Sequence, residues 1–166
     1  MALKAPAGYR VAGAVLLVLG AAGLLGFHFL WRGSEVISIP QVSDCALHRE
    51  PCSSSLPAGG SMVFGIDPRQ PAPEQVFNLR AEFHGVEPEA VGARFKGVNM
   101  NMGQLEYYVH WLAREDTRDG PVTFSGKGGV FACSIGVMQW QVIVRLQVGG
   151  RVYEVPFAFE TTNPGS

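Results

Sequence analysis

The run of 21 residues from 11 to 31 constrains this chain most, because it is almost wholly apolar and carries no charged side chain. A helix of that length matches the hydrocarbon core of a bilayer, about 30 Å thick, which predicts a transmembrane helix. Lys4 and Arg10 precede the run, whereas Arg32 alone follows it closely. This excess of positive charge predicts residues 1–10 in the cytoplasm. We therefore expect a single-pass membrane protein whose C-terminal part lies outside the cytoplasm.

A cleavable signal peptide is the alternative interpretation of the same run. Residues 20–22, Gly-Ala-Ala, form a small-residue cleavage site after a short apolar stretch. Residues 24–31 would then remain apolar after the cut, which favours an uncleaved anchor. Both interpretations export the rest of the chain.

Beyond the span, apolar and polar residues alternate with a period of two in many short runs, and Gly and Pro bound these runs. Such alternation is typical of strands with one buried face. Gly149-Gly150 predicts a hairpin turn between the two longest runs. The predicted strands cover residues 61–66, 77–84, 91–96, 107–114, 122–126, 130–134, 140–148 and 152–161.

Seven or eight short strands over about 100 residues are typical of an all-β, immunoglobulin-like antiparallel sandwich. We expect this sandwich to span residues 59–166. Residues 32–58 are expected to be a linker that carries Cys45 and Cys52.

Charge and motifs exclude several classes of function. Three of the 13 Lys and Arg residues flank the span and all 14 Asp and Glu residues follow it, so the exported part is mildly acidic. Such a domain lacks the basic patch that binds nucleic acid. The sequence has no G-x-S-x-G, H-E-x-x-H, P-loop or paired C-x-x-C motif, so we expect no enzymatic activity. We expect His84 and His110 to be solvated histidines on strands.

Cys45 and Cys52 lie close together in the sequence and would face an oxidising compartment. A local disulfide between them is expected to stiffen the segment before the sandwich. A redox-active pair is a weaker alternative, because the spacing is wider than C-x-x-C. Cys133 is left over, either as a small buried hydrophobe or as a metal ligand.

Met100 and Met102 occupy a polar, glycine-flanked segment that does not look like a core strand. In an extended backbone, side chains at i and i+2 lie about 7 Å apart on one face. Thioether and thiolate donors select Cu(I), and Cys133 and Met138 could complete a sulfur-rich set of ligands. The alternative is that Met100, Met102 and Met138 only fill gaps in the core.

Two functions from different classes follow from these patterns. The first is an exported, membrane-anchored protein that binds Cu(I) through sulfur ligands. The second is a structural or assembly subunit that binds a membrane partner protein through aromatic side chains on a strand, namely Tyr107, Tyr108 and Trp111.

One combination of segments is similar to a known group of proteins. It consists of residues 95–103, Phe-Lys-Gly-Val-Asn-Met-Asn-Met-Gly, then Cys133, then Met-Gln-Trp at 138–140. It resembles a group of small uncharacterised proteobacterial proteins with one N-terminal span. That group is similar, more distantly, to the YtkA-like and FixH-like exported sandwich domains. The resemblance implies an accessory protein for copper handling or oxidase assembly, with copper as a candidate ligand. It also implies an anchor in a bacterial inner membrane and a C-terminal domain in the periplasm.

Overall fold

The computed structural model describes residues 35–100, 109–115, 120–131 and 136–162. These residues belong to one compact unit, which begins at Glu35. Within the described ranges, no helix has the length and apolar character needed to cross a bilayer. The predicted span at 11–31 lies outside them.

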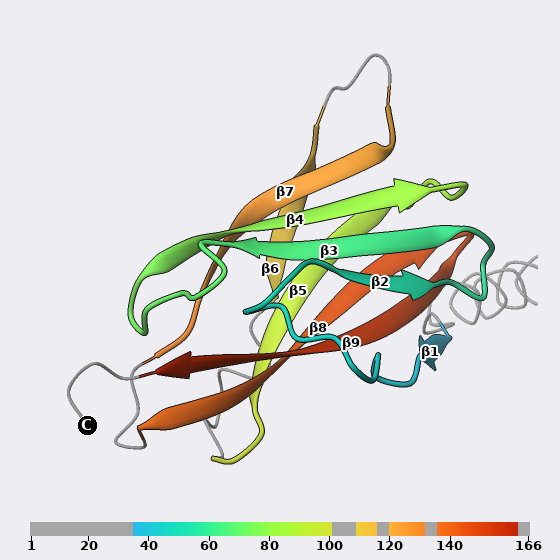
Figure 1. Cartoon of the computed structure of the whole chain (residues 1–166). Coiled ribbons are helices and arrows are strands. Elements are labelled where there is room, and N and C mark those ends of the chain that lie inside the picture. Colours follow the sequence, from blue (N-terminus) through green and yellow to red (C-terminus); the bar gives the residue numbers. More distant parts are fainter. Residues whose placement is uncertain (1–34, 101–108, 116–119, 132–135, 163–166) are drawn as a thin grey trace, which may run out of the picture. The chain divides into compact units, whose positions relative to one another are not determined.

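The compact unit is all-β, as predicted, and its described strands form one mixed sheet. The strands follow the order β1-β9-β8-β5-β6-β7-β4-β3-β2 (Figure 1). β1 runs parallel to β9, and the other pairings are antiparallel. The strands are β1 (Val36–Ser38), β2 (Cys52–Ser55), β3 (Ser61–Asp67), β4 (Val76–His84), β5 (Ala90–Gly97), β6 (His110–Arg114), β7 (Val122–Gly129), β8 (Val137–Val148) and β9 (Arg151–Thr162).

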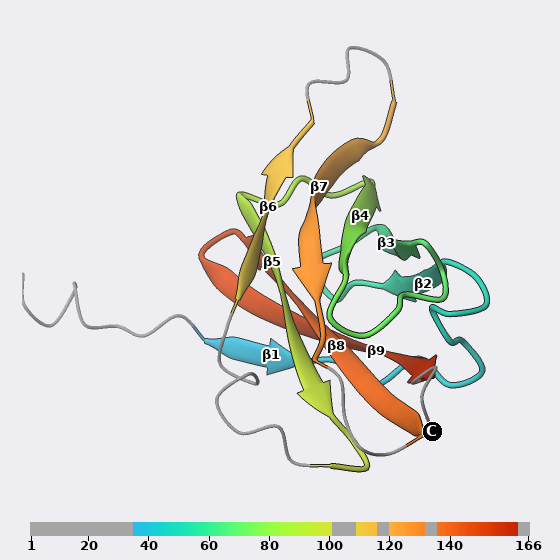
Figure 2. The ribbon, with the colours of Figure 1, turned by 90° about the vertical axis from the view of Figure 1, so that its left-hand side faces the viewer.

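The sheet is curled, so that its two halves face each other (Figures 1 and 2). β6 joins the halves: it pairs with β5 through residues 110–112 and with β7 through residues 113–114. Aromatic rings fill the space between them. The Phe64 ring of β3 stacks on Phe157 of β9, with centroids 5.7 Å apart, and Phe77 of β4 meets Phe159 edge-on at 6.3 Å. These ring contacts tie β3 and β4 to β9.

β8 and β9 show why the alternation produces this core. Trp140, Val142, Val144 and Leu146 point inward from β8 and are buried, whereas the residues between them are partly exposed. The predicted hairpin turn at Gly149-Gly150 is present. Both glycines have a positive φ, which residues other than glycine rarely adopt. The prediction of one dry face on these two strands is therefore confirmed.

The predicted linker at 32–58 differs from the structure. Most of this segment is part of the compact unit, since β1 and β2 pair with β9 and β3. Leu47 and Leu56 are buried in the common core. These two strands have three and four residues, too few to show a periodic pattern, and they raise the number of described strands to nine. Of the predicted strand at 130–134, the described residues 130 and 131 lie in no strand.

Candidate functional site

Met138 lies near the start of β8, at the end of the inward-facing row of that strand. Its side chain is only 2% exposed, and it pairs in register with Thr161 of β9. Two residues further along, the Trp140 Nε1–H donates a hydrogen bond to the Thr161 hydroxyl oxygen at 3.0 Å. Met138 therefore belongs to the part of the core that lies at the start of β8.

Asn99 joins the segment after β5 to the start of β8. The regular pairing of β5 ends at Gly97, and the Val98 backbone N–H then donates to the Gln139 carbonyl at 2.8 Å. The Asn99 Nδ2 group donates to the Val137 carbonyl at 3.0 Å, and Oδ1 accepts the Gln139 N–H, also at 3.0 Å. The side-chain amide thus bonds to the backbone on both sides of Met138.

Met100 follows Asn99 directly and is partly buried against the core. The contacts of Asn99 therefore bring the Met100 segment to the part of β8 that carries Met138. The other two predicted sulfur ligands, Met102 and Cys133, lie outside the described residues. Among the described residues, no three His, Cys, Asp or Glu side chains gather in a way that could hold a metal ion.

Exposed apolar side chains lie at the end of the compact unit where β4 and β8 begin and β5 and β7 end. Val98 and Val137 flank the hydrogen bonds of Asn99, and Val76 opens β4 beside Phe77, whose ring lies 5.7 Å from that of Phe95. Within the described ranges, this end carries four of the six large hydrophobic side chains that are exposed. We call it the apolar end and define it by Val76, Val98, Phe131 and Val137.

Trp111 is the residue of the predicted partner-binding set that lies among the described residues. It lies on β6 and is 67% exposed. A Cβ atom at Gly92 of β5 would come within 3.2 Å of the Trp111 ring and within 2.7 Å of the Val109 side chain. The indole therefore covers the β5 backbone at Gly92, where a side chain would not fit. Tyr107 and Tyr108 lie outside the described residues.

The predicted disulfide between Cys45 and Cys52 is present, with 5.8 Å between the two Cα atoms. Cys52 belongs to β2 and is fully buried, whereas Cys45 is partly exposed. Cys45 lines an open groove of about 430 Å³. The polar side chains of this groove are those of Gln41, Asp44, His48, Arg49, Gln139, Gln141 and Glu160.

One ring nitrogen of His48, which lines this groove, accepts a hydrogen bond from the backbone. Its Nδ1 accepts the Glu160 N–H at 3.2 Å. The neutral ring therefore carries its proton on Nε2, which is the tautomer that this bond requires.

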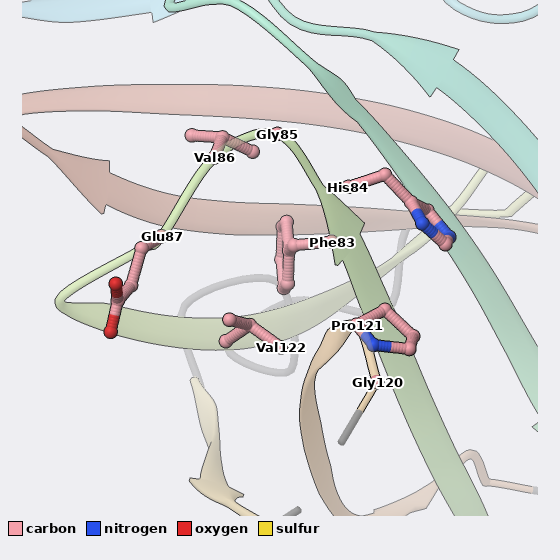
Figure 3. Close-up of a pocket in the computed structure, with 8 residues that line it drawn as sticks. All are labelled: Phe83, His84, Gly85, Val86, Glu87, Gly120, Pro121 and Val122. Carbon is pink, nitrogen blue, oxygen red and sulfur yellow. The ribbon is translucent and has the colours of Figure 1, made fainter. Parts of the chain in front are cut away.

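A second hollow, of about 620 Å³, lies beside the turn that follows β4 (Figure 3). Its lining contains one imidazole, that of His84, and one carboxylate, that of Glu87, which point to different sides in Figure 3. Glu87 forms an ion pair with Arg114, with the nearest oxygen and nitrogen 2.6 Å apart. The two titratable groups of this hollow therefore do not form an acid–base pair.

His110 differs from the solvated histidine that the sequence predicts. It is partly buried on β6, and its ring lies 5.3 Å from that of Phe95, edge to face. Burial lowers the pKa of His110 from its usual value of 6.5, although a hydrogen bond with the backbone of Lys127 acts in the opposite direction. Alternation along the short β6 could have indicated an inward position two residues before the buried Leu112.

Comparisons with known proteins add little. No protein-family model matches the chain, and no curated protein matches it significantly. A crystal structure of a DUF4785 family protein from Legionella pneumophila is similar over 62% of this chain, with 11% sequence identity and a TM-score of 0.36. This chain spans 29% of the length of that protein. The similarity is too weak to carry an argument about fold or function.

Proposed function

We propose that this chain is a membrane-anchored periplasmic accessory protein that binds Cu(I), for copper handling or for oxidase assembly. It acts without catalysis of its own. Its ligands are Met100, Met102, Cys133 and Met138, and residues 11–31 anchor it in the inner membrane. A membrane protein client receives the metal or assembles with its help.

The observation that carries this proposal is the contact of Asn99 with the backbone on both sides of Met138. It supports a shared site because Met100 is the next residue in the chain. Thioethers are soft donors that select Cu(I) over harder ions. Two sulfur-containing side chains, Met100 from the segment after β5 and Met138 from β8, are therefore available at one end of the domain.

The burial of Met138 supports the reduced ion in particular. A doubly charged ion loses more hydration energy than a singly charged one when it enters an apolar site. The core around Met138, which is 2% exposed, provides such surroundings. A site here favours Cu(I) over Cu(II) on this ground as well as on ligand softness.

The test is a Cu(I) titration of the full chain in detergent micelles, under reducing conditions and against a competing chelator. Met100→Leu and Met138→Leu remove sulfur with little change in volume. Met62→Leu is the matched control, since Met62 is also a fully buried methionine but lies on β3.

We expect Met100→Leu combined with Met138→Leu to weaken Cu(I) binding about tenfold or more. Even the loss of a partner outside the ligand set commonly costs that much. The Met62→Leu chain should bind as the unchanged protein does. Equal Cu(I) affinity in the double variant, the Met62→Leu chain and the unchanged protein would refute the copper site.

The exposure of Trp111 favours the second candidate, an assembly subunit that binds a membrane partner protein. Large exposed aromatic side chains are enriched in protein interfaces. The full chain and its Trp111→Ser variant are purified from membranes in mild detergent, with Val36→Ser as an exposed apolar control on β1. A specific partner lost only from Trp111→Ser, with Cu(I) affinity unchanged, would favour this candidate over copper binding.

We also propose that the curled sheet is an immunoglobulin-like sandwich. The facing of β3 and β4 against β9 supports this, as does β6, which passes from one half to the other as a corner strand does in packed sheets. An experimental structure with the two layers face to face would agree. A closed barrel would contradict it.

A further inference from the structure

The outer edge of β9 is covered by two separate pieces of the same segment. β1 pairs with the first residues of β9. Ile39 continues that pairing, because its N–H donates a hydrogen bond to the Glu154 carbonyl. Ala46 then bridges to Ala158, and the Leu47 N–H donates to the Ala158 carbonyl at 2.8 Å. Uncovered strand edges pair with other chains, so this cover protects β9 from association.

After residue 48 the chain crosses to the other half of the sheet. There Cys52 begins β2, which pairs with β3 and lies at the far end of the strand order from β1. β9 and β3 approach each other where Phe64 stacks on Phe157. The Cys45–Cys52 disulfide therefore connects the segment bound to β9 with a strand bound to β3, across the gap between them. We call the residues from 45 to 52 the clasp.

We propose that this disulfide is a redox-controlled lock on the clasp. Oxidised, it holds residues 46–48 against β9. Reduced, it lets them leave, and the edge of β9 from Ala158 to Glu160 opens. This inference does not depend on copper binding.

Few contacts hold the clasp on β9 besides the disulfide. The described ones are the Ala46–Ala158 bridge with its Leu47 N–H bond, the bond from the Glu160 N–H to His48, and the burial of the Leu47 side chain. A disulfide between residues seven apart restricts the open states of such a segment, although less than a bridge across a longer loop would. Without it, opening needs the loss of these few local contacts alone.

The two sulfur atoms differ in access, and this difference sets the course of reduction. Cys45 lines the open groove and Cys52 is fully buried. The thiolate of a dithiol reductant attacks Cys45 Sγ, and the Cys52 sulfur leaves and takes up a proton. The second thiol of the reductant then attacks the reductant sulfur that is bound to Cys45, and Cys45 is released as a thiol. The cystine gains two electrons and two protons, and the reductant becomes a disulfide.

Burial of Cys52 makes the first step slow. The negative charge on the departing Cys52 sulfur is poorly solvated in its buried position, which makes this sulfur a poor leaving group. The lock therefore opens only under sustained reduction, and the clasp stays closed in an oxidising compartment.

Hydrogen exchange of the full chain in micelles tests this inference, with dithiothreitol as the dithiol. We expect reduction to speed exchange at the Leu47 and Glu160 amides about tenfold or more, as loss of a short disulfide loop implies. Amides inside the β8–β9 hairpin, such as that of Val144, should exchange at an unchanged rate. Unchanged rates at Leu47 and Glu160 would overturn the proposal, and so would a loss of protection throughout the hairpin, which indicates global unfolding.

Two variants separate the lock from other effects. Cys133→Ser removes the third cysteine and should show the same response to dithiothreitol. His48→Ala removes the acceptor of the Glu160 N–H and should speed exchange at Glu160 under oxidising conditions, but leave Leu47 protected. If His48→Ala releases Leu47 to the same extent as reduction does, the disulfide is not the lock.

Discussion

The interior of the sheet and the apolar end are both built from hydrophobic residues, yet they differ in how those residues are used. In the interior, Phe95 is 1% exposed and meets the rings of Phe77 and Phe159. At the apolar end, Val98 is 59% exposed although it lies only three residues further along the chain. Buried apolar area stabilises the fold, whereas a cluster of exposed apolar side chains is typical of an interaction site. Hydrophobic character alone therefore does not distinguish core from surface.

The largest expected effect is that of Phe95→Ala, which tests the interior. It removes a fully buried ring with three aromatic neighbours, so we expect the free energy of unfolding to fall by about 3 to 5 kcal/mol. Urea unfolding followed by tryptophan fluorescence measures this change. Val98→Ala is the matched control and should change stability by less than about 0.5 kcal/mol. Similar losses in both variants would erase the distinction between the two regions.

A smaller effect is expected for Asn99→Ala, at the junction of the two regions. The variant loses two hydrogen bonds to the backbone of β8, both at the exposed surface, so we expect a loss of about 1 kcal/mol. Asn99→Asp keeps the acceptor for the Gln139 N–H but not the donor for the Val137 carbonyl. Its stability should therefore lie between those of Asn99→Ala and the unchanged protein. Urea midpoints of the three proteins decide this. An Asn99→Ala chain as stable as the unchanged one would show that Asn99 does not hold the Met100 segment on β8.

The smallest effect concerns His110, which packs against Phe95. Burial lowers the pKa of folded His110, so the unfolded chain binds the proton more readily as the pH falls through 6.5. The free energy of unfolding should therefore decrease between pH 7.5 and pH 5. His110→Phe keeps an aromatic ring but cannot titrate, and it should flatten this slope in urea midpoints measured across the range. His84→Gln, an exposed histidine on β4, should keep the slope of the unchanged protein. A slope unaffected by His110→Phe would assign the pH dependence to other groups.

Much of the fold was predictable because long strands carry their own signal. The alternation in β4, β8 and β9 predicted which face of each strand is buried, and Gly149-Gly150 predicted the hairpin. β1 and β2 were not predicted, since three or four residues cannot display a period. His110 was predicted to be solvated, because the packing of Phe95 against β6 is not visible in the sequence.

The candidate site was predictable in residue type but not in arrangement. Met100 and Met138 stood out by their chemistry, whereas Asn99, which joins their segments, gave no signal of its own. Its role depends on where β5 ends relative to β8, and that register is set by the pairing of Gly97 with Trp140.

The sequence by itself determined the all-β class, the faces of the long strands and the local disulfide, because each depends on neighbours along the chain. Only the tertiary structure decided that residues 36–38 pair with β9, that Asn99 meets β8 and that the disulfide connects the two halves of the sheet. These contacts join residues far apart in the sequence. Their energy depends on the register and curvature of the whole sheet, which no short segment encodes.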